Sequence, residues 1–193
     1  MARQSNAFKQ TVVKGTNKND ILLGGSGADR LVGGGGDDIL IAAWNDIAST
    51  PSGYLIYDGG IGVDTLDFSN LARPDGEGIA VDLNRGYIYR QQDENYFGEL
   101  HDPQLADRLS GAVSGIENVV GTDSDDYFSG GYGDNVFDGR GGDDVLKGTM
   151  GSDTLIGGAG DDHIYLGQQT GTNTGDGGGA VGNDTFYAMG NMA

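Results

Sequence analysis

Residues 121–165 decide the fold, because they contain five uninterrupted copies of one nine-residue pattern. The copies read GTDSDDYFS, GGYGDNVFD, GRGGDDVLK, GTMGSDTLI and GGAGDDHIY. Each copy has Gly at position 1, Asp or Asn at position 6 and a large apolar residue at position 8. A disordered Gly-rich linker would not keep a bulky apolar residue at every ninth position, so the array predicts a repeating folded unit.

The same pattern occurs five more times outside this array. Residues 15–41 hold three consecutive copies, and single copies occupy residues 59–67 and 179–187. The ten position-6 residues are Asp20, Asp29, Asp38, Asp64, Asp126, Asn135, Asp144, Asp153, Asp162 and Asp184. The ten position-8 residues, all apolar, are Leu22, Leu31, Leu40, Leu66, Phe128, Phe137, Leu146, Leu155, Ile164 and Phe186.

Composition narrows the class of protein. The chain has 193 residues, the length of about one domain, with 38 Gly and a net charge of −18. Asp makes up 25 of the 29 acidic residues, and Asp and Gly favour turns, which argues against a helical bundle. The acidity argues against nucleic acid as a partner, and no apolar run is long enough for a transmembrane helix. The absence of Cys excludes disulfides and thiolate metal sites.

The nine-residue spacing predicts both a core and a metal site. Gly supplies the tight turn, and the last three residues form a short strand whose position-8 side chain points inward. If successive copies turn on alternate sides, copies n and n+2 stack 18 residues apart. Pairs of Asp carboxylates then converge with turn carbonyls, and such hard oxygen ligands suit Ca²⁺.

These repeats resemble those of the RTX, or haemolysin-type calcium-binding, family. The resemblance implies an all-β fold, a parallel β-roll with several Ca²⁺ ions between stacked turns. It also implies type I secretion to the extracellular space or the bacterial cell surface, in agreement with the lack of a Sec-type signal in residues 1–16. We expect one domain over residues 1–193, with a β-rich insertion at residues 68–120.

The resemblance also implies which position-6 residues share a calcium ion. Copies on the same side of the roll give the pairs Asp20–Asp38, Asp126–Asp144, Asp144–Asp162 and a weaker Asn135–Asp153. Pairing of Asp29 with Asp64 requires residues 42–58 to loop out. Pairing of Asp153 with Asp184 requires residues 166–178 to loop out as well, and their composition predicts a flexible loop. In the insertion, the runs IAVDL from Ile79, YIYR from Tyr87 and GIENVVG from Gly115 predict short strands.

The repeats hold 17 of the 25 Asp residues, and their mutual repulsion disfavours the compact state without metal. We therefore expect folding to require calcium. No catalytic constellation is visible, and three roles stay open: a structural or assembly protein, an accessory module of a secreted enzyme, and an enzyme with its site in residues 68–120. The accessory role would include binding of acidic polysaccharide through Arg73, Arg85, Arg90 and Arg108. Apolar outward positions of the first array, expected to be covered by the insertion or a partner copy, are Ile21, Leu23, Val32, Ile39 and Ile41.

Overall fold

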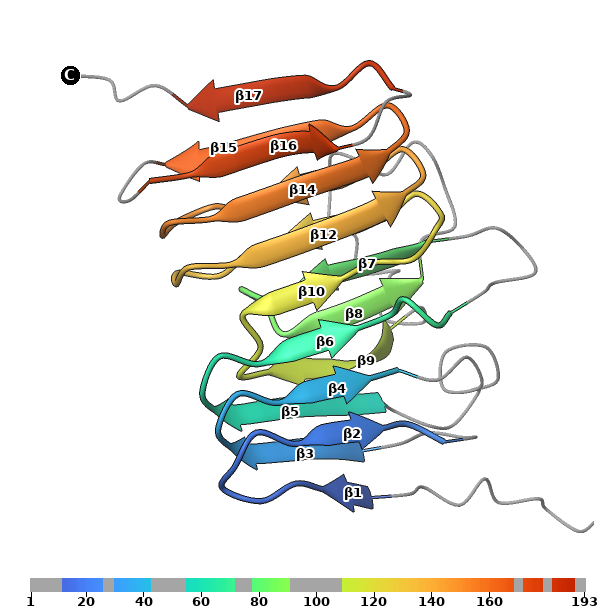
Figure 1. Ribbon diagram of the computed structural model, residues 1–193, viewed down its shortest axis with the longest axis vertical. Helices are drawn as coiled ribbons and strands as arrows, with labels where there is room; N and C mark the ends of the chain where they lie inside the picture. The colour runs from blue at the N-terminus through green and yellow to red at the C-terminus, as the bar shows by residue number, and fades with distance from the viewer. Residues whose placement is uncertain are drawn as a thin grey trace, which may run out of the picture.

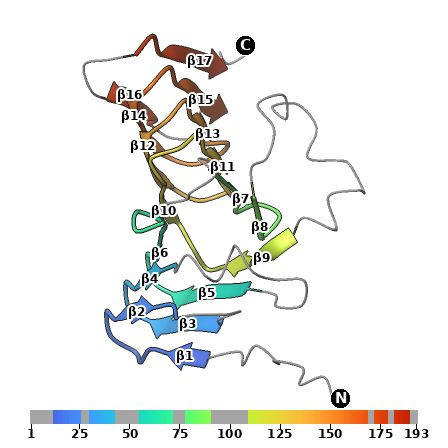
Figure 2. The same cartoon turned by 90° about the vertical axis from the view of Figure 1, so that its right-hand side faces the viewer.

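The computed structural model describes residues 12–25, 30–42, 55–71, 78–90, 109–168, 172–178 and 182–189. Within these residues the chain forms two β-sheets whose strands stack along the long axis of the molecule (Figures 1 and 2). The ten-stranded sheet runs in the order β1 (Val12–Lys14), β3 (Arg30–Gly35), β5 (Leu55–Ile61), β9 (Leu109–Ser114), β8 (Tyr87–Arg90), β7 (Ile79–Asp82), β11 (Tyr127–Ser129), β13 (Val145–Lys147), β15 (His163–Gln168), β17 (Thr185–Met189). The seven-stranded sheet runs in the order β16 (Thr174–Gly178), β14 (Thr154–Ala159), β12 (Val136–Gly141), β10 (Asn118–Val120), β6 (Thr65–Asp67), β4 (Ile39–Ile41), β2 (Ile21–Leu23).

Strands of the repeats alternate between the two sheets, and each pairs in parallel with the strand two places along the chain. In the ten-stranded sheet Tyr127 pairs with Val145, and Val145 pairs with His163. In the seven-stranded sheet Val136 pairs with Thr154. Each of these steps is 18 residues, which confirms the predicted stacking of copies n and n+2. The fold is a parallel β-roll.

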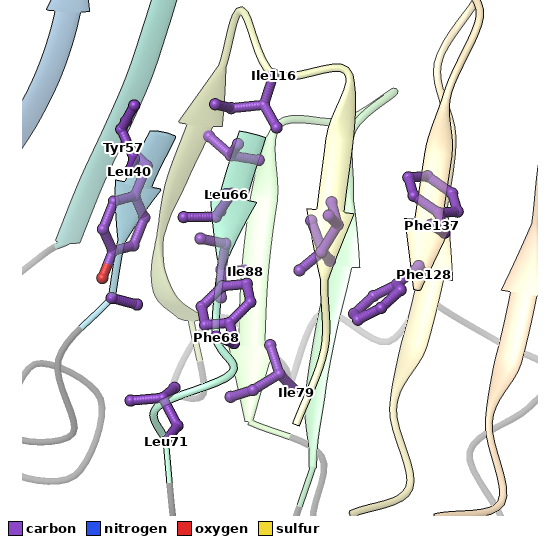
Figure 3. Close-up of a cluster of buried hydrophobic side chains, with 14 of the residues drawn as sticks. Leu40, Tyr57, Leu66, Phe68, Leu71, Ile79, Ile88, Ile116, Phe128 and Phe137 are labelled. Atoms are coloured by element: carbon purple, nitrogen blue, oxygen red, sulfur yellow. The ribbon is translucent and has the colours of Figure 1, made fainter. Parts of the chain in front are cut away.

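The core lies between the two sheets and includes most of the predicted position-8 residues (Figure 3). Nine of the ten are buried, and Phe128 and Phe137 meet edge to face across the sheets with ring centroids 5.7 Å apart. Phe186 is the exception at 48% exposure, because it lies in β17, the edge strand of the ten-stranded sheet. One inward residue per copy is too little for an isolated unit, so the core exists only in the stack.

The middle of the chain completes the ten-stranded sheet. The predicted strands at IAVDL and YIYR are β7 and β8, which pair antiparallel with each other, and β8 pairs antiparallel with β9. These strands enter between β5 and β11 and bury Ile79 and Ile88 in the common core (Figure 3). The roll is therefore parallel throughout its repeats and antiparallel only in this central segment.

Two interpretations of the linking segments are wrong. The described parts of residues 166–178 are mostly strand and not loop, because β15 extends to Gln168 and β16 pairs in parallel with β14. The supposed insertion 42–58 includes the start of β5, whose Ile56 pairs with Arg30 of β3. Both segments thus add strands to the roll. No helix in the described part of the chain is long and apolar enough to cross a membrane.

Candidate metal centre

The described position-6 residues lie in turns between the sheets, each directly before a strand. Asp144, for example, is followed by β13. In its turn, Gly142 has a φ of 103°, and a Cβ at this residue would lie 2.3 Å from the carbonyl carbon of Ser124 in the neighbouring coil. Only glycine accommodates both the left-handed backbone and this contact, so successive turns can stack backbone on backbone.

A ladder of hydrogen bonds joins the position-6 residues of stacked coils. The main-chain N–H of Asp20 donates to Oδ1 of Asp38 at 2.8 Å. The N–H of Asp126 donates to Oδ1 of Asp144 at 2.7 Å, and the N–H of Asp144 donates to Oδ1 of Asp162 at 2.9 Å. The structure therefore brings together these three predicted pairs.

The fourth predicted pair is also adjacent, but one end of the ladder differs from the prediction. The N–H of Asn135 donates to Oδ1 of Asp153 at 3.0 Å. Asp153 in turn donates to Oδ1 of Asn173 at 2.9 Å, whereas Asp184 accepts from the N–H of Asp162 at 3.2 Å. The predicted pairing of Asp153 with Asp184 is wrong, because the two residues precede strands of different sheets.

The predicted pairing of Asp29 with Asp64 involves Asp29, which lies outside the described residues. Asp64 itself precedes β6 of the seven-stranded sheet, where it stacks on Asp38. The N–H of Asp38 donates to Oδ1 of Asp64 at 2.7 Å. The N–H of Asp64 then donates to Oε2 of Glu117 at 2.9 Å, so a glutamate takes the position-6 place in the next coil.

Five of the predicted ligands keep a second carboxylate oxygen without a hydrogen-bond partner. Each side chain is at most 1% exposed, so water does not solvate this oxygen. The atoms are Oδ2 of Asp38, Asp64, Asp144, Asp153 and Asp162. A buried carboxylate oxygen without a donor is costly unless a cation lies beside it.

The position-1 glycines outline the space that such a cation would enter. A Cβ at Gly139 would lie 2.0 Å from Oδ2 of Asp144 and 2.5 Å from the carbonyl oxygen of Gly157 in the next coil. A Cβ at Gly33 would lie 2.2 Å from Oδ2 of Asp38 and 2.4 Å from the carbonyl oxygen of Gly59. Carboxylate and carbonyl oxygens therefore face one glycine-lined cradle, and this donor set fits Ca²⁺.

Main-chain carbonyls are needed to complete any such site. Among the described residues, no three His, Cys, Asp or Glu side chains gather closely enough to hold a metal ion by themselves. A cation bound beside Oδ2 of Asp144 would thus take ligands from the turn backbone, as the carbonyl of Gly157 illustrates. Flexible coordination by many oxygens is typical of Ca²⁺, whereas Mg²⁺ demands a stricter octahedron.

A family model for the RTX calcium-binding nonapeptide repeat (4 copies) matches residues 12–46, 112–146 and 138–172. The chain belongs to the RTX repeat family. No curated protein matches it. The matched ranges contain both predicted arrays, 15–41 and 121–165. The RTX repeats are calcium-binding, and the roll that they form is a structural fold and not a catalytic one.

The electrostatics of the RTX turns favour a bound cation. Burial, followed by the nearby charge of Asp126, raises the pKa of Asp144 to about 10 from its ordinary value of 3.8. Burial is also the main cause that raises the pKa of Asp126 to about 7 and that of Asp162 to about 6. The pKa values of Asp64 and Asp153 are raised for the same reason. Without metal, burial therefore disfavours the charged form of these carboxyls, and a divalent cation beside them would favour it.

Not every position-6 residue has a free oxygen. Oδ2 of Asp126 accepts the main-chain N–H of Thr122 at 2.7 Å, and Oδ1 accepts the N–H of Ile79 at 2.6 Å. Oδ2 of Asp20 likewise accepts the N–H and the hydroxyl of Thr16 at 2.6 and 2.7 Å. The bonds from Thr16 lower the pKa of Asp20. Sequence reasoning set only Asn135 apart as a weaker site and missed these threonine contacts.

Of the basic residues considered for polysaccharide binding, Arg85 alone has a described side chain, and that side chain is 40% exposed. Arg85 donates to Oδ2 of the buried Asp82 at 3.1 Å, within the turn between β7 and β8. Arg73 and Arg108 lie outside the described residues, and the side chain of Arg90 is not described. Arg85 therefore has a local structural role in this turn.

Proposed function

We propose that this chain is an extracellular one-domain RTX protein that is largely unfolded at cytosolic calcium, and that its repeats fold when it meets extracellular calcium. The observation that carries the proposal is the set of five buried Oδ2 atoms without a donor. The net charge of −18 adds repulsion that bound cations would relieve. Binding free energy would then become folding free energy, which suits export of an unfolded chain through a type I channel.

Calcium titration of the chelator-treated full chain tests this proposal. Far-UV circular dichroism and hydrodynamic radius are followed together, and Mg²⁺ at the same concentrations is the control. We expect a cooperative gain of β signal with compaction at roughly 0.1–1 mM Ca²⁺, the range of extracellular calcium modules. A chain that is fully folded in chelator, or that responds equally to Mg²⁺, would contradict the proposal.

For the biological role we propose a structural or assembly protein at the cell surface. This role is supported by an apolar strip on the outer side of the seven-stranded sheet, where Ile21 and Leu23 are 70% and 64% exposed. In β4, Ile39 and Ile41 pair with these residues and extend the strip. Apolar surface of this kind favours contact with another chain.

Light scattering in saturating calcium tests the assembly role. We expect the full chain to form larger species in calcium, and we expect Ile21→Ser with Leu23→Ser to reduce them while calcium-induced folding is kept. Lys14→Ser, another exposed strand residue, serves as the matched control. A chain that stays monomeric at all calcium concentrations would exclude self-assembly through this strip.

A further inference from the structure

The hydrogen bonds around the position-6 residues divide the coils into two classes. In one class a buried Oδ2 atom has no partner, and Asp144 and Asp162 are examples. In the other class a neighbouring group already fills the place beside the side chain, as Thr122 does for Asp126. The distinction is independent of the repeat pattern, because Asp126 and Asp144 occupy the same position in adjacent coils of one sheet.

Asn135 belongs to the second class by a different contact. Its Oδ1 accepts the N–H of Gly131 at 3.1 Å, and its Nδ2 donates to the main-chain carbonyl of Glu117 at 2.8 Å. The amide N–H thus points at a carbonyl oxygen of the adjacent coil, where a cation would otherwise bridge the two coils. A hydrogen-bond donor and a bound cation satisfy the same oxygen, so one replaces the other.

Thr149 shows that a threonine at position 2 is not sufficient. It occupies the same place in its copy as Thr122 does, yet its hydroxyl donates to the carbonyl of Gly131. Oδ2 of Asp153, in the copy of Thr149, consequently has no donor. Thr149 has a left-handed φ of 75°, whereas the main-chain N–H of Thr122 donates to Asp126. The backbone conformation at position 2, and not the presence of threonine, therefore decides whether the carboxylate is satisfied.

We propose that calcium binds beside Asp38, Asp64, Asp144, Asp153 and Asp162, and that hydrogen bonds from Thr16, Thr122 and the Asn135 amide replace the ion in the coils of Asp20, Asp126 and Asn135. This assignment rests on the proposed calcium-dependent function and narrows it. Asp126 and Asn135 precede β11 and β12, the strands that join the second array to β7 and β10. The joint between the central segment and the second array is therefore held without metal, whereas the coils on either side of it require calcium.

The number of bound ions tests the assignment. Equilibrium dialysis of the full chain against radioactive Ca²⁺ gives the ions bound per chain at saturation, with circular dichroism as a check of folding. Asp144→Asn and Asp126→Asn are matched substitutions one coil apart. We expect Asp144→Asn to lose at least one ion and Asp126→Asn to bind as many ions as the wild type. Equal losses in the two variants would overturn the assignment.

A gain of binding provides an independent test if Asp144→Asn fails to fold. Asn135→Asp removes the Nδ2 donor and places a second carboxylate oxygen opposite the carbonyl of Glu117. We expect this variant to bind one more ion than the wild type, and an unchanged number would overturn the assignment. A wild type that binds no calcium would instead refute the proposed function itself, so the two failures are distinguishable.

Discussion

The central antiparallel segment and the flanking repeats bury aspartate in opposite ways. In the centre, Asp82 is buried and accepts from the N–H and the guanidinium of Arg85 at 2.8 and 3.1 Å. In the repeats, Asp144 is buried with an oxygen that has no donor. In the central segment the chain itself supplies the positive charge, through Arg85. In the repeats a bound ion must supply it. A stack of turns at 18-residue spacing has no room for a basic side chain beside each carboxylate, because backbone packs directly on backbone.

The two regions also differ in their apolar cores. The central segment and the coils beside it contribute Tyr57, Phe68, Ile79 and Ile88, all fully buried. Tyr57 and Phe68 meet edge to face with ring centroids 6.4 Å apart. A repeat coil contributes one inward residue, such as Leu146. The comparison indicates that apolar burial dominates in the centre and that calcium must add to it in the repeats.

Truncation of one core residue in each region should separate these contributions most strongly. Ile88→Ala should lower the free energy of unfolding by about 2–5 kcal/mol whether or not calcium is present. Leu146→Ala should have a similar cost in saturating calcium and a much smaller one in chelator, because its coil is then already disordered. Urea unfolding with and without calcium measures both. A calcium-independent cost at Leu146 would remove the distinction between the regions.

Filling the glycine-lined cradle should affect only the repeats. Gly139→Ala would place a methyl group 2.0 Å from Oδ2 of Asp144, and we expect a loss of about 1–3 kcal/mol together with a higher calcium midpoint. Gly131→Ala is the matched control, because a Cβ there would meet nothing within 4 Å. Calcium titrations followed by circular dichroism compare the two variants. Identical midpoints would mean that the cradle does not hold the ion.

The stability of the calcium-free protein should depend on pH in a direction opposite to ordinary acid denaturation. The pKa values of Asp162, Asp126 and Asp144 are raised from 3.8 to about 6, about 7 and about 10, so the fold binds more protons than the unfolded chain above pH 4. Stability in chelator should therefore fall as pH rises from 4 through these values. Calcium binds the ionised carboxylates, so its stabilising effect should grow over the same interval.

Thermal melts at pH 5 and pH 8 measure this dependence. In chelator we expect the higher Tm at pH 5, and with calcium we expect the larger gain in Tm at pH 8. Asp144→Asn, which removes one of the buried acids, should flatten the dependence in chelator. A higher Tm at pH 8 in chelator would show that the buried carboxyls are not destabilised by ionisation.

The smallest effect is expected at the ion pair of the central segment. Arg85→Met removes the contact with Asp82, and the half-exposed position of Arg85 limits the loss to about 1 kcal/mol or less. The loss should be equal with and without calcium, and the number of bound ions should not change. Chemical denaturation and equilibrium dialysis check these two points. A calcium-dependent loss would show that the central segment is coupled to the ion sites.

The nine-residue period of the repeats was sufficient to predict the parallel β-roll and most of its core. The nine-residue spacing predicts the inward position of Leu146 and the stacking of Asp126 on Asp144. The alternation of apolar and polar residues predicts the strands at Ile79 and Tyr87. Glu117 could have been found, because Val119 follows it at the distance that separates positions 6 and 8. Its strand was predicted, but the coil was not recognised as a repeat, because Ala112 stands in place of the position-1 glycine.

The coil of Asn173 carries a weaker signal. Its position 8 is Gly175, which has no side chain. Phe186 and Leu166 fill the space instead, because their atoms lie 2.9 and 3.1 Å from the position that a Cβ of residue 175 would take. A pattern that requires a large apolar residue therefore reads this strand as a loop. The satisfied state of Asp126 could not be predicted either, because it depends on the backbone conformation that lets the main-chain N–H of Thr122 reach Oδ2.

Hydrogen exchange of the full chain with and without calcium tests the contrast between the two regions most directly. We predict that chelation removes amide protection from β13, β14 and β15, whose coils contain Asp144, Asp153 and Asp162, and leaves more protection in β7, β8 and β9. Equal loss in both regions, or full protection of β13 to β15 in chelator, would contradict the account.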